Sequence, residues 1–225
     1  MNQAQLFRLS GIALVVGAVL SIISTVVSGA LFPNSNDLAV ATNPLNIGNG
    51  IVGSIGTFLA LLGLPGLYLR RAEDGGVMWL LGVVLIALTG VVFGVFLGLT
   101  SALVFPALAT QAPALLNEGP PPSFFAVFIV GGLANLVGAV LMGLPMLTRH
   151  IYPRWCGWLM MVEAVFAAAS FVVNGPSSSG VISLIFGIIS PLPLFVVLGW
   201  IGYELWTDRL AAAGAVSGVV QSQPA

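Results

Sequence analysis

The sequence has almost none of the side chains that bind metals or form covalent intermediates. It contains no lysine, one histidine (His150) and one cysteine (Cys156). Without lysine there is no Schiff base to retinal or pyridoxal phosphate. One cysteine forms no disulfide within the chain, and one histidine beside it is too little for a zinc, iron–sulfur or bis-histidine haem site. We therefore expect no cofactor.

Catalytic motifs are absent as well. The sequence has no G-x-S-x-G elbow, no H-E-x-x-H motif and no paired acids within its apolar runs. Residues 48–53 spell G-x-G-x-x-G, but they begin an apolar run rather than a βαβ unit, so we interpret them as a packing face. We expect the protein not to be an enzyme.

Charge is scarce and apolar residues dominate. Charged residues make up 6% of the 225 residues and hydrophobic residues 58%. A soluble domain carries roughly 25% charged residues, so lipid must be the main solvent of this chain. Six dispersed arginines and a net charge of −1 give no basic patch, and nucleic-acid binding is not expected.

Apolar runs long enough to cross a bilayer recur along the chain. A spanning helix needs about 20 apolar residues. Six runs meet this length, at about 9–32, 47–69, 77–104, 123–148, 155–174 and 180–206. The sequence therefore predicts an all-α fold, a bundle of six transmembrane helices over residues 1–209, followed by a disordered tail at 210–225.

The arginines predict the orientation of this bundle. With six spans, every arginine falls on one side of the membrane: Arg8, Arg70, Arg71, Arg149, Arg154 and Arg209. The positive-inside rule then places both termini, and the tail, in the cytoplasm. All Trp and Tyr residues map to the same side, where amphipathic rings favour the headgroup zone. We expect a multi-pass plasma-membrane protein whose main partner is the lipid bilayer.

Two segments allow more than one interpretation. The run at 9–32 ends in Ser28-Gly29-Ala30, which resembles a signal-peptide cleavage site. Its apolar stretch is longer than the usual 7–15 residues of a signal peptide, so we expect a retained helix. Residues 105–122 should form the longest outer loop, with a short interfacial helix as an option.

Small or polar residues recur at every fourth position in three of the runs. The sets are Gly17, Ser21, Thr25 and Gly29; Gly90, Gly94 and Gly98; and Gly131, Asn135, Ala139 and Gly143. Each set lines one helix face, and small residues let helices approach closely in lipid. These faces serve either packing within the bundle or contact with a second copy or another membrane subunit.

Prolines interrupt three of the runs, at Pro65, at Pro145 and at the pair Pro191 and Pro193. Each proline lacks an N–H and frees the carbonyl four residues earlier. One interpretation is a kink that neighbouring hydroxyl groups satisfy. The other is an interrupted helix that lines a binding site.

Glu163 and Asn135 are the candidate ligand or proton-site residues. Glu163 lies about nine residues into the run 155–174, roughly 13 Å from its edge at about 1.5 Å per residue. An ionised carboxylate there costs several kcal/mol, so the neutral acid is favoured. Glu163 is either a proton or cation site, or a neutral acid that hydrogen-bonds a neighbour such as Asn135 or Ser170.

Two short segments carry a resemblance. Residues 153–159 (PRWCGWL) and 199–206 (GWIGYELW) resemble segments of small uncharacterised multi-pass membrane proteins of bacteria. The resemblance implies a bacterial plasma membrane and no particular activity.

The function expected from these features is the binding or passage of a small solute, ion or lipid. The alternative is a structural or accessory subunit of a larger membrane complex. A polar cavity around Glu163 that opens to water favours the first, whereas a dry contact with one amide favours the second.

Overall fold

The computed structural model describes residues 3–32, 38–112, 122–173 and 189–207, and every regular element within them is helical. The helices in chain order are α1 (Gln3–Leu31), α2 (Leu38–Ala41), α3 (Pro44–Arg70), α4 (Ala72–Thr89), the π-helical segments η1 (Gly90–Leu97) and η2 (Thr100–Val104), α5 (Phe105–Gln111), α7 (Pro122–Thr148), α8 (Arg154–Val173) and α10 (Leu192–Thr207). The prediction of an all-α fold is confirmed for these residues.

Several of these helices suit a lipid environment. Four stretches are long and apolar enough to cross a membrane, namely Ala4–Leu31, Pro44–Arg70, Ala72–Gln111 and Ala126–Thr148. In addition, α8 has 20 residues and the apolar α10 has 16. The first part of the predicted run 180–206 and the predicted tail at 210–225 lie outside the described residues.

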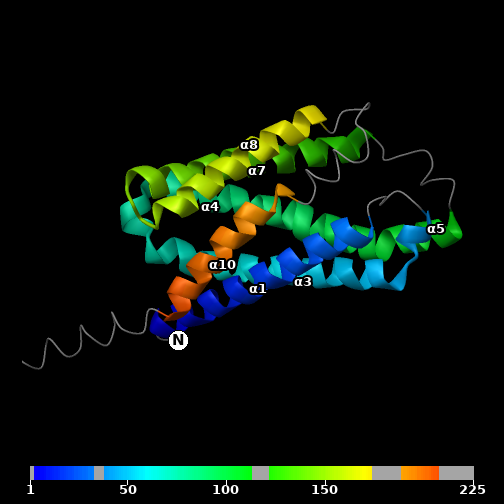
Figure 1. Ribbon diagram of the computed structural model, residues 1–225, viewed down its shortest axis with the longest axis horizontal. Helices are drawn as coiled ribbons and strands as arrows, with labels where there is room; N and C mark the ends of the chain where they lie inside the picture. The colour runs from blue at the N-terminus through cyan, green and yellow to red at the C-terminus, as the bar shows by residue number, and fades with distance from the viewer. Residues whose placement is uncertain (1–2, 33–37, 113–121, 174–188, 208–225) are drawn as a thin grey trace, which may run out of the picture.

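The long helices lie side by side in two groups (Figure 1). In the first group, α1 packs against both α3 and α10. In the second, α7 packs between α4 and α8. Contacts of α3 with η1 and of α10 with α8 join the two groups. The core between them is built from Leu, Met, Ile and Val side chains with Trp79 and Tyr152.

Glycines bring the helix backbones into contact. A Cβ atom on Gly17 of α1 would lie 2.5 Å from the Ala60 nitrogen and 2.6 Å from the Gly56 oxygen of α3. A Cβ on Gly202 of α10 would lie 2.8 Å from the Gly11 oxygen of α1. Lipid offers no hydrophobic reward for helix association, so such close approaches supply van der Waals contact.

The other predicted small-residue faces lie against helices of the same chain. A Cβ on Gly94 would meet Thr57 at 2.3 Å, and a Cβ on Gly143 would meet Met161 at 2.3 Å. At these positions the glycines pack the bundle itself.

The third predicted span is longer than expected. Gly76, with a φ of +63°, separates the turn at 72–75 from the helix that follows, so this helix begins at the predicted residue 77. It then continues through η1, η2 and α5 to Gln111, where the sequence predicted a loop from residue 105 with a short interfacial helix as an option. Pro106 follows the π-helical segment η2, where the Phe105 N–H bonds the Thr100 carbonyl five residues earlier, so the helix carries the proline at a place where its hydrogen-bond ladder already departs from the α pattern.

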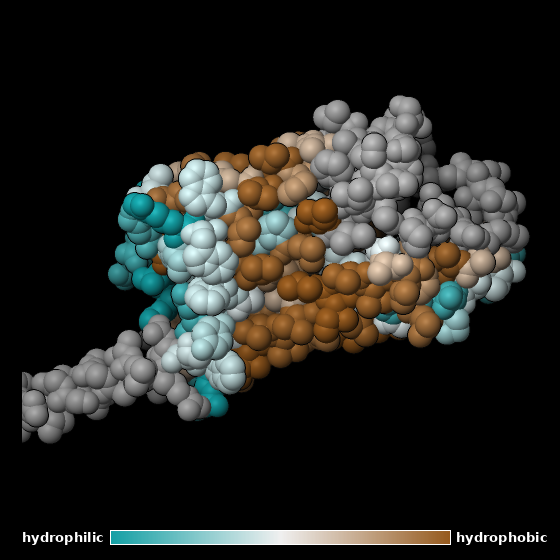
Figure 2. Space-filling view, in the orientation of Figure 1, coloured by the Kyte–Doolittle hydropathy of each residue, from teal (hydrophilic) through white to brown (hydrophobic). Residues whose placement is uncertain are grey.

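Polar residues gather at one end of the bundle. Figure 2 shows hydrophilic and pale residues at the end where α1 begins and α10 ends, and hydrophobic residues along the middle. The exposed tryptophan and tyrosine residues predicted for this end are Trp155, Trp158, Trp200, Tyr203 and Trp206. Trp79 and Tyr152 differ from the expected lipid anchors, because they are 0% and 5% exposed and belong to the core.

Candidate functional site

Glu163 and Asn135 form a buried acid–amide pair. Glu163 lies in the middle of α8 and is 1% exposed, although it is a carboxylic acid. The Asn135 side chain, on α7, donates a hydrogen bond from Nδ2 to Oε1 of Glu163 at 2.9 Å. The structure thus brings together Glu163 and Asn135, one of the two neighbours that the sequence offered as its hydrogen-bond partner.

The α7–α8 hairpin sets this pairing. The two helices are joined by only residues 149–153, and they pack closely where a Cβ on Gly157 would lie 3.1 Å from the Gly143 oxygen. From that contact, Glu163 is six residues further along α8 and Asn135 is eight residues back along α7. At about 1.5 Å per residue these steps cover similar distances, so the two side chains meet between the helices.

Each partner of the pair keeps a second oxygen that is not satisfied. Oε2 of Glu163 and Oδ1 of Asn135 are both buried and have no hydrogen-bond partner among the described residues. Leaving a buried polar atom unpaired costs about 1–3 kcal/mol. An ionised carboxylate and an amide oxygen are both acceptors, so neither can satisfy the other. The pair therefore lacks one donor or one positive charge.

Ser170, another possible partner of Glu163, is engaged elsewhere. Its hydroxyl donates to the Phe166 carbonyl, one turn earlier in α8, at 2.8 Å. Asn135 is consequently the hydrogen-bond donor to Glu163 that the described residues provide.

The prolines do not gather at the acid–amide pair. Pro65 lies within α3 and is exposed, and α3 continues through it to Arg70. Pro145 is buried within α7, ten residues from Asn135, or about 15 Å along the helix. Pro191 lies in the turn before α10, and Pro193 is the second residue of α10, where a missing N–H is tolerated.

The remaining polar candidates make local contacts. Glu204, near the end of α10, accepts a hydrogen bond from Trp200 Nε1 at 2.9 Å. His150 contacts Arg154 at 2.9 Å, and Cys156 is buried. Within the described ranges, no three His, Cys, Asp or Glu side chains come close enough to hold a metal ion.

A second polar cluster was missed by the sequence reasoning. Arg71 Nε, Trp79 Nε1 and the Tyr152 hydroxyl are buried donors without a hydrogen-bond partner in the described part of the chain. They come from two separate segments: Arg71 and Trp79 from the α3–α4 connection and the start of α4, and Tyr152 from the α7–α8 turn. The sequence offered only the Arg70-Arg71 pair as a signal, and it was interpreted for orientation alone.

No protein-family model, no curated protein and no solved structure matches this chain. The function therefore has to be argued from the chain's own geometry.

Proposed function

We propose that this chain is a six-span plasma-membrane protein that binds one small positive charge, a proton or a monovalent cation, at Glu163 and Asn135. Four helices of spanning length support the bundle, and α8 and α10 supply the remaining two crossings. Both termini then lie on the cytoplasmic side, where the arginines gather.

Contacts between the helix ends support a single end of the bundle for these arginines and the N-terminus. Arg149, which follows α7, donates a hydrogen bond from Nη1 to the Asp74 carbonyl after α3 at 2.9 Å. Arg70 lies over the ring of Phe7, near the start of α1, at 5.9 Å. The α3–α4 turn, the α7–α8 turn and the start of α1 are therefore at one end, which we call the arginine end.

The observation that carries the proposal is the pair of unpartnered acceptors, Oε2 of Glu163 and Oδ1 of Asn135. A proton on Oε2 turns that atom into a donor and removes the negative charge. The cost of burying a charge and the cost of burying an acceptor without a donor therefore fall together. A bare monovalent cation held by the oxygens neutralises the carboxylate in the same way. A buried acid in a membrane helix is a candidate proton or cation site for this reason.

The test compares the wild type with Glu163→Gln in lipid nanodiscs. Thermal unfolding is followed from pH 5 to 9 in choline chloride and again in NaCl or LiCl. Anything that binds only the folded state raises its stability. The wild type should gain stability as the pH falls, or on addition of Na⁺ or Li⁺, and Glu163→Gln should show neither gain. If the unfolding temperatures of the wild type and Glu163→Gln change identically with pH and with added Na⁺ or Li⁺, the proposal is refuted.

The alternative function is an accessory subunit of a larger membrane complex. The near-complete burial of Glu163 and its contact with a single amide favour this alternative, because a dry pair exchanges slowly with water. Extraction in a mild detergent followed by sizing under native conditions tests it. An obligate subunit runs with its partners, and a protein that always runs alone is not one.

A further inference from the structure

The buried atoms without partners in the acid–amide pair are hydrogen-bond acceptors. At the arginine end, the buried atoms without partners can donate hydrogen bonds. Arg71 Nε, Trp79 Nε1 and the Tyr152 hydroxyl are buried without a hydrogen-bond partner among the described residues. The Trp79 and Tyr152 rings lie 5.8 Å apart, and the Arg71 guanidinium lies 5.5 Å from the Tyr152 ring centre. Arg71 Nε and Trp79 Nε1 can only donate, and the Tyr152 hydroxyl has a proton to donate even if it also accepts from Arg71, so the partner that this neighbourhood lacks is an acceptor rather than a cation.

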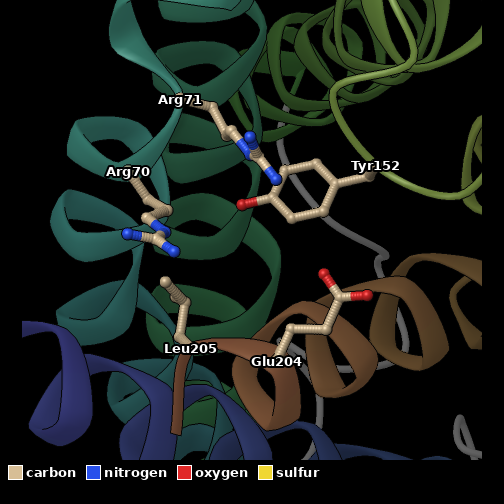
Figure 3. A pocket seen from close by; sticks show the side chains of 5 residues that line it. All are labelled: Arg70, Arg71, Tyr152, Glu204 and Leu205. Carbon is tan, nitrogen blue, oxygen red and sulfur yellow. The ribbon is translucent and has the colours of Figure 1, made fainter. Parts of the chain in front are cut away.

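A small cavity lies beside two of these donors. It measures about 20 Å³ and is lined by Arg70, Arg71, Tyr152, Glu204 and Leu205. Figure 3 shows both guanidinium groups and the Tyr152 hydroxyl directed to one side of it, with Glu204 approaching from α10. Tyr152 is 5% exposed, so its hydroxyl is a buried group that faces the cavity rather than a surface group. The volume admits a single water-sized oxygen atom.

We propose that this cavity binds one oxygen of a phosphate group. Guanidinium groups bind phosphate through charge-assisted, often paired hydrogen bonds, and the Tyr152 hydroxyl adds a neutral donor. The enclosed space takes one oxygen, and the rest of the phosphate lies outward, towards the exposed side of Arg70.

The neighbouring charges select the form of phosphate. Arg70 and Arg71 supply two positive charges at the cavity. Two carboxylates oppose them: Glu204 lines the same cavity, and Oδ2 of Asp74 lies 3.6 Å from Nη1 of Arg71. The acids offset much of the attraction and disfavour a dianion. A singly charged phosphodiester fits this balance better than a phosphate monoester. Phospholipid headgroups carry such a group at the depth where the arginine end of a membrane-inserted bundle lies, and a soluble phosphate is the other source of the same chemistry.

The experiment measures binding to the purified full-length protein by native mass spectrometry. Phosphatidylglycerol and diacylglycerol, which lacks the phosphate, are titrated in parallel. The soluble arm is glycerophosphoglycerol, the phosphodiester headgroup of phosphatidylglycerol without its acyl chains. Tyr152→Phe removes the hydroxyl but keeps the ring against Trp79. Arg154→Gln is the matched control, because Arg154 is an exposed arginine at the same end that contacts His150 instead of the cavity.

Wild type and Arg154→Gln should bind phosphatidylglycerol in preference to diacylglycerol, and Tyr152→Phe should bind it about tenfold or more weakly. If the wild type instead binds the soluble phosphodiester, loses that binding in Tyr152→Phe, and does not prefer phosphatidylglycerol to diacylglycerol, the natural ligand is a soluble phosphate rather than a lipid headgroup. Equal binding by Tyr152→Phe and Arg154→Gln in every arm would overturn the proposal, as would the absence of phosphate binding by the wild type. None of these outcomes depends on Glu163, so the two proposals fail separately.

Discussion

The substitution Gly17→Ala is expected to force α1 away from α3. The added Cβ would lie 2.5 Å from the Ala60 nitrogen and 2.6 Å from the Gly56 oxygen, whereas ordinary contact is 3.4–4 Å. Both contacting atoms are backbone, so the helices must separate by about 1 Å, and overpacking of this kind costs about 1–3 kcal/mol. Alanine also gains about 1 kcal/mol over glycine in a helix.

Gly48→Ala is the matched control, because a Cβ there meets nothing within 4 Å. Both variants share the gain in helix propensity, so their free energies of unfolding should differ by about 1–3 kcal/mol, the overpacking cost alone. Unfolding by SDS titration in mixed micelles, followed by tryptophan fluorescence, measures this difference. If Gly17→Ala is as stable as Gly48→Ala, the close packing of α1 on α3 is wrong.

Three further predictions concern the polar sites and one turn. Asn135→Ala should lower the free energy of unfolding by about 0.6–1.7 kcal/mol, whereas Glu163→Gln, which keeps an oxygen to accept from Asn135, should leave it nearly unchanged. Equal losses in the same SDS titration would contradict the pairing. Burial raises the pKa of Tyr152 well above its ordinary value of 10.0, although the charges of Arg71 and Arg70 oppose the shift. Above about pH 10 the folded state therefore keeps the Tyr152 proton that the unfolded state loses. The free energy of unfolding should then fall by up to about 1.4 kcal/mol per pH unit. The same slope in Tyr152→Phe would contradict this assignment to Tyr152. Gly76→Ala should cost about 1–3 kcal/mol, because its φ of +63° and ψ of −160° suit only glycine, and an unchanged melting temperature would show the turn to be unstrained.

Helix boundaries followed closely from the sequence where an apolar run ends in charge or proline. The predicted runs 123–148 and 155–174 correspond to α7 (Pro122–Thr148) and α8 (Arg154–Val173). In lipid every backbone group must be satisfied within its helix, so the apolar run and the helix coincide. The continuation of the third span to Gln111 was not predicted, because residues 105–122 were expected to form a loop with at most a short interfacial helix.

The two polar sites differed in how far they could be predicted. An acid and an amide within apolar helices are conspicuous, so Glu163 and Asn135 were identified from their positions in the predicted runs. Their 2.9 Å contact depends on the register of the α7–α8 hairpin, which Gly143 and Gly157 set by close approach. The donors at the arginine end could not be found in this way. Their meeting depends on the α3–α4 and α7–α8 turns folding onto one another, and Trp and Tyr at helix ends are typical of any membrane interface.

The most direct measurement of the central claim is the infrared spectrum of the Glu163 side chain. The difference between wild type and Glu163→Gln is recorded at pH 7 in a buffer free of small metal cations. We predict the carbonyl band of a protonated carboxylic acid, which should shift in Asn135→Ala as the hydrogen bond to Oε1 is lost, or a carboxylate band that responds to added Na⁺ or Li⁺. An ionised carboxylate band that no added cation alters would contradict the account.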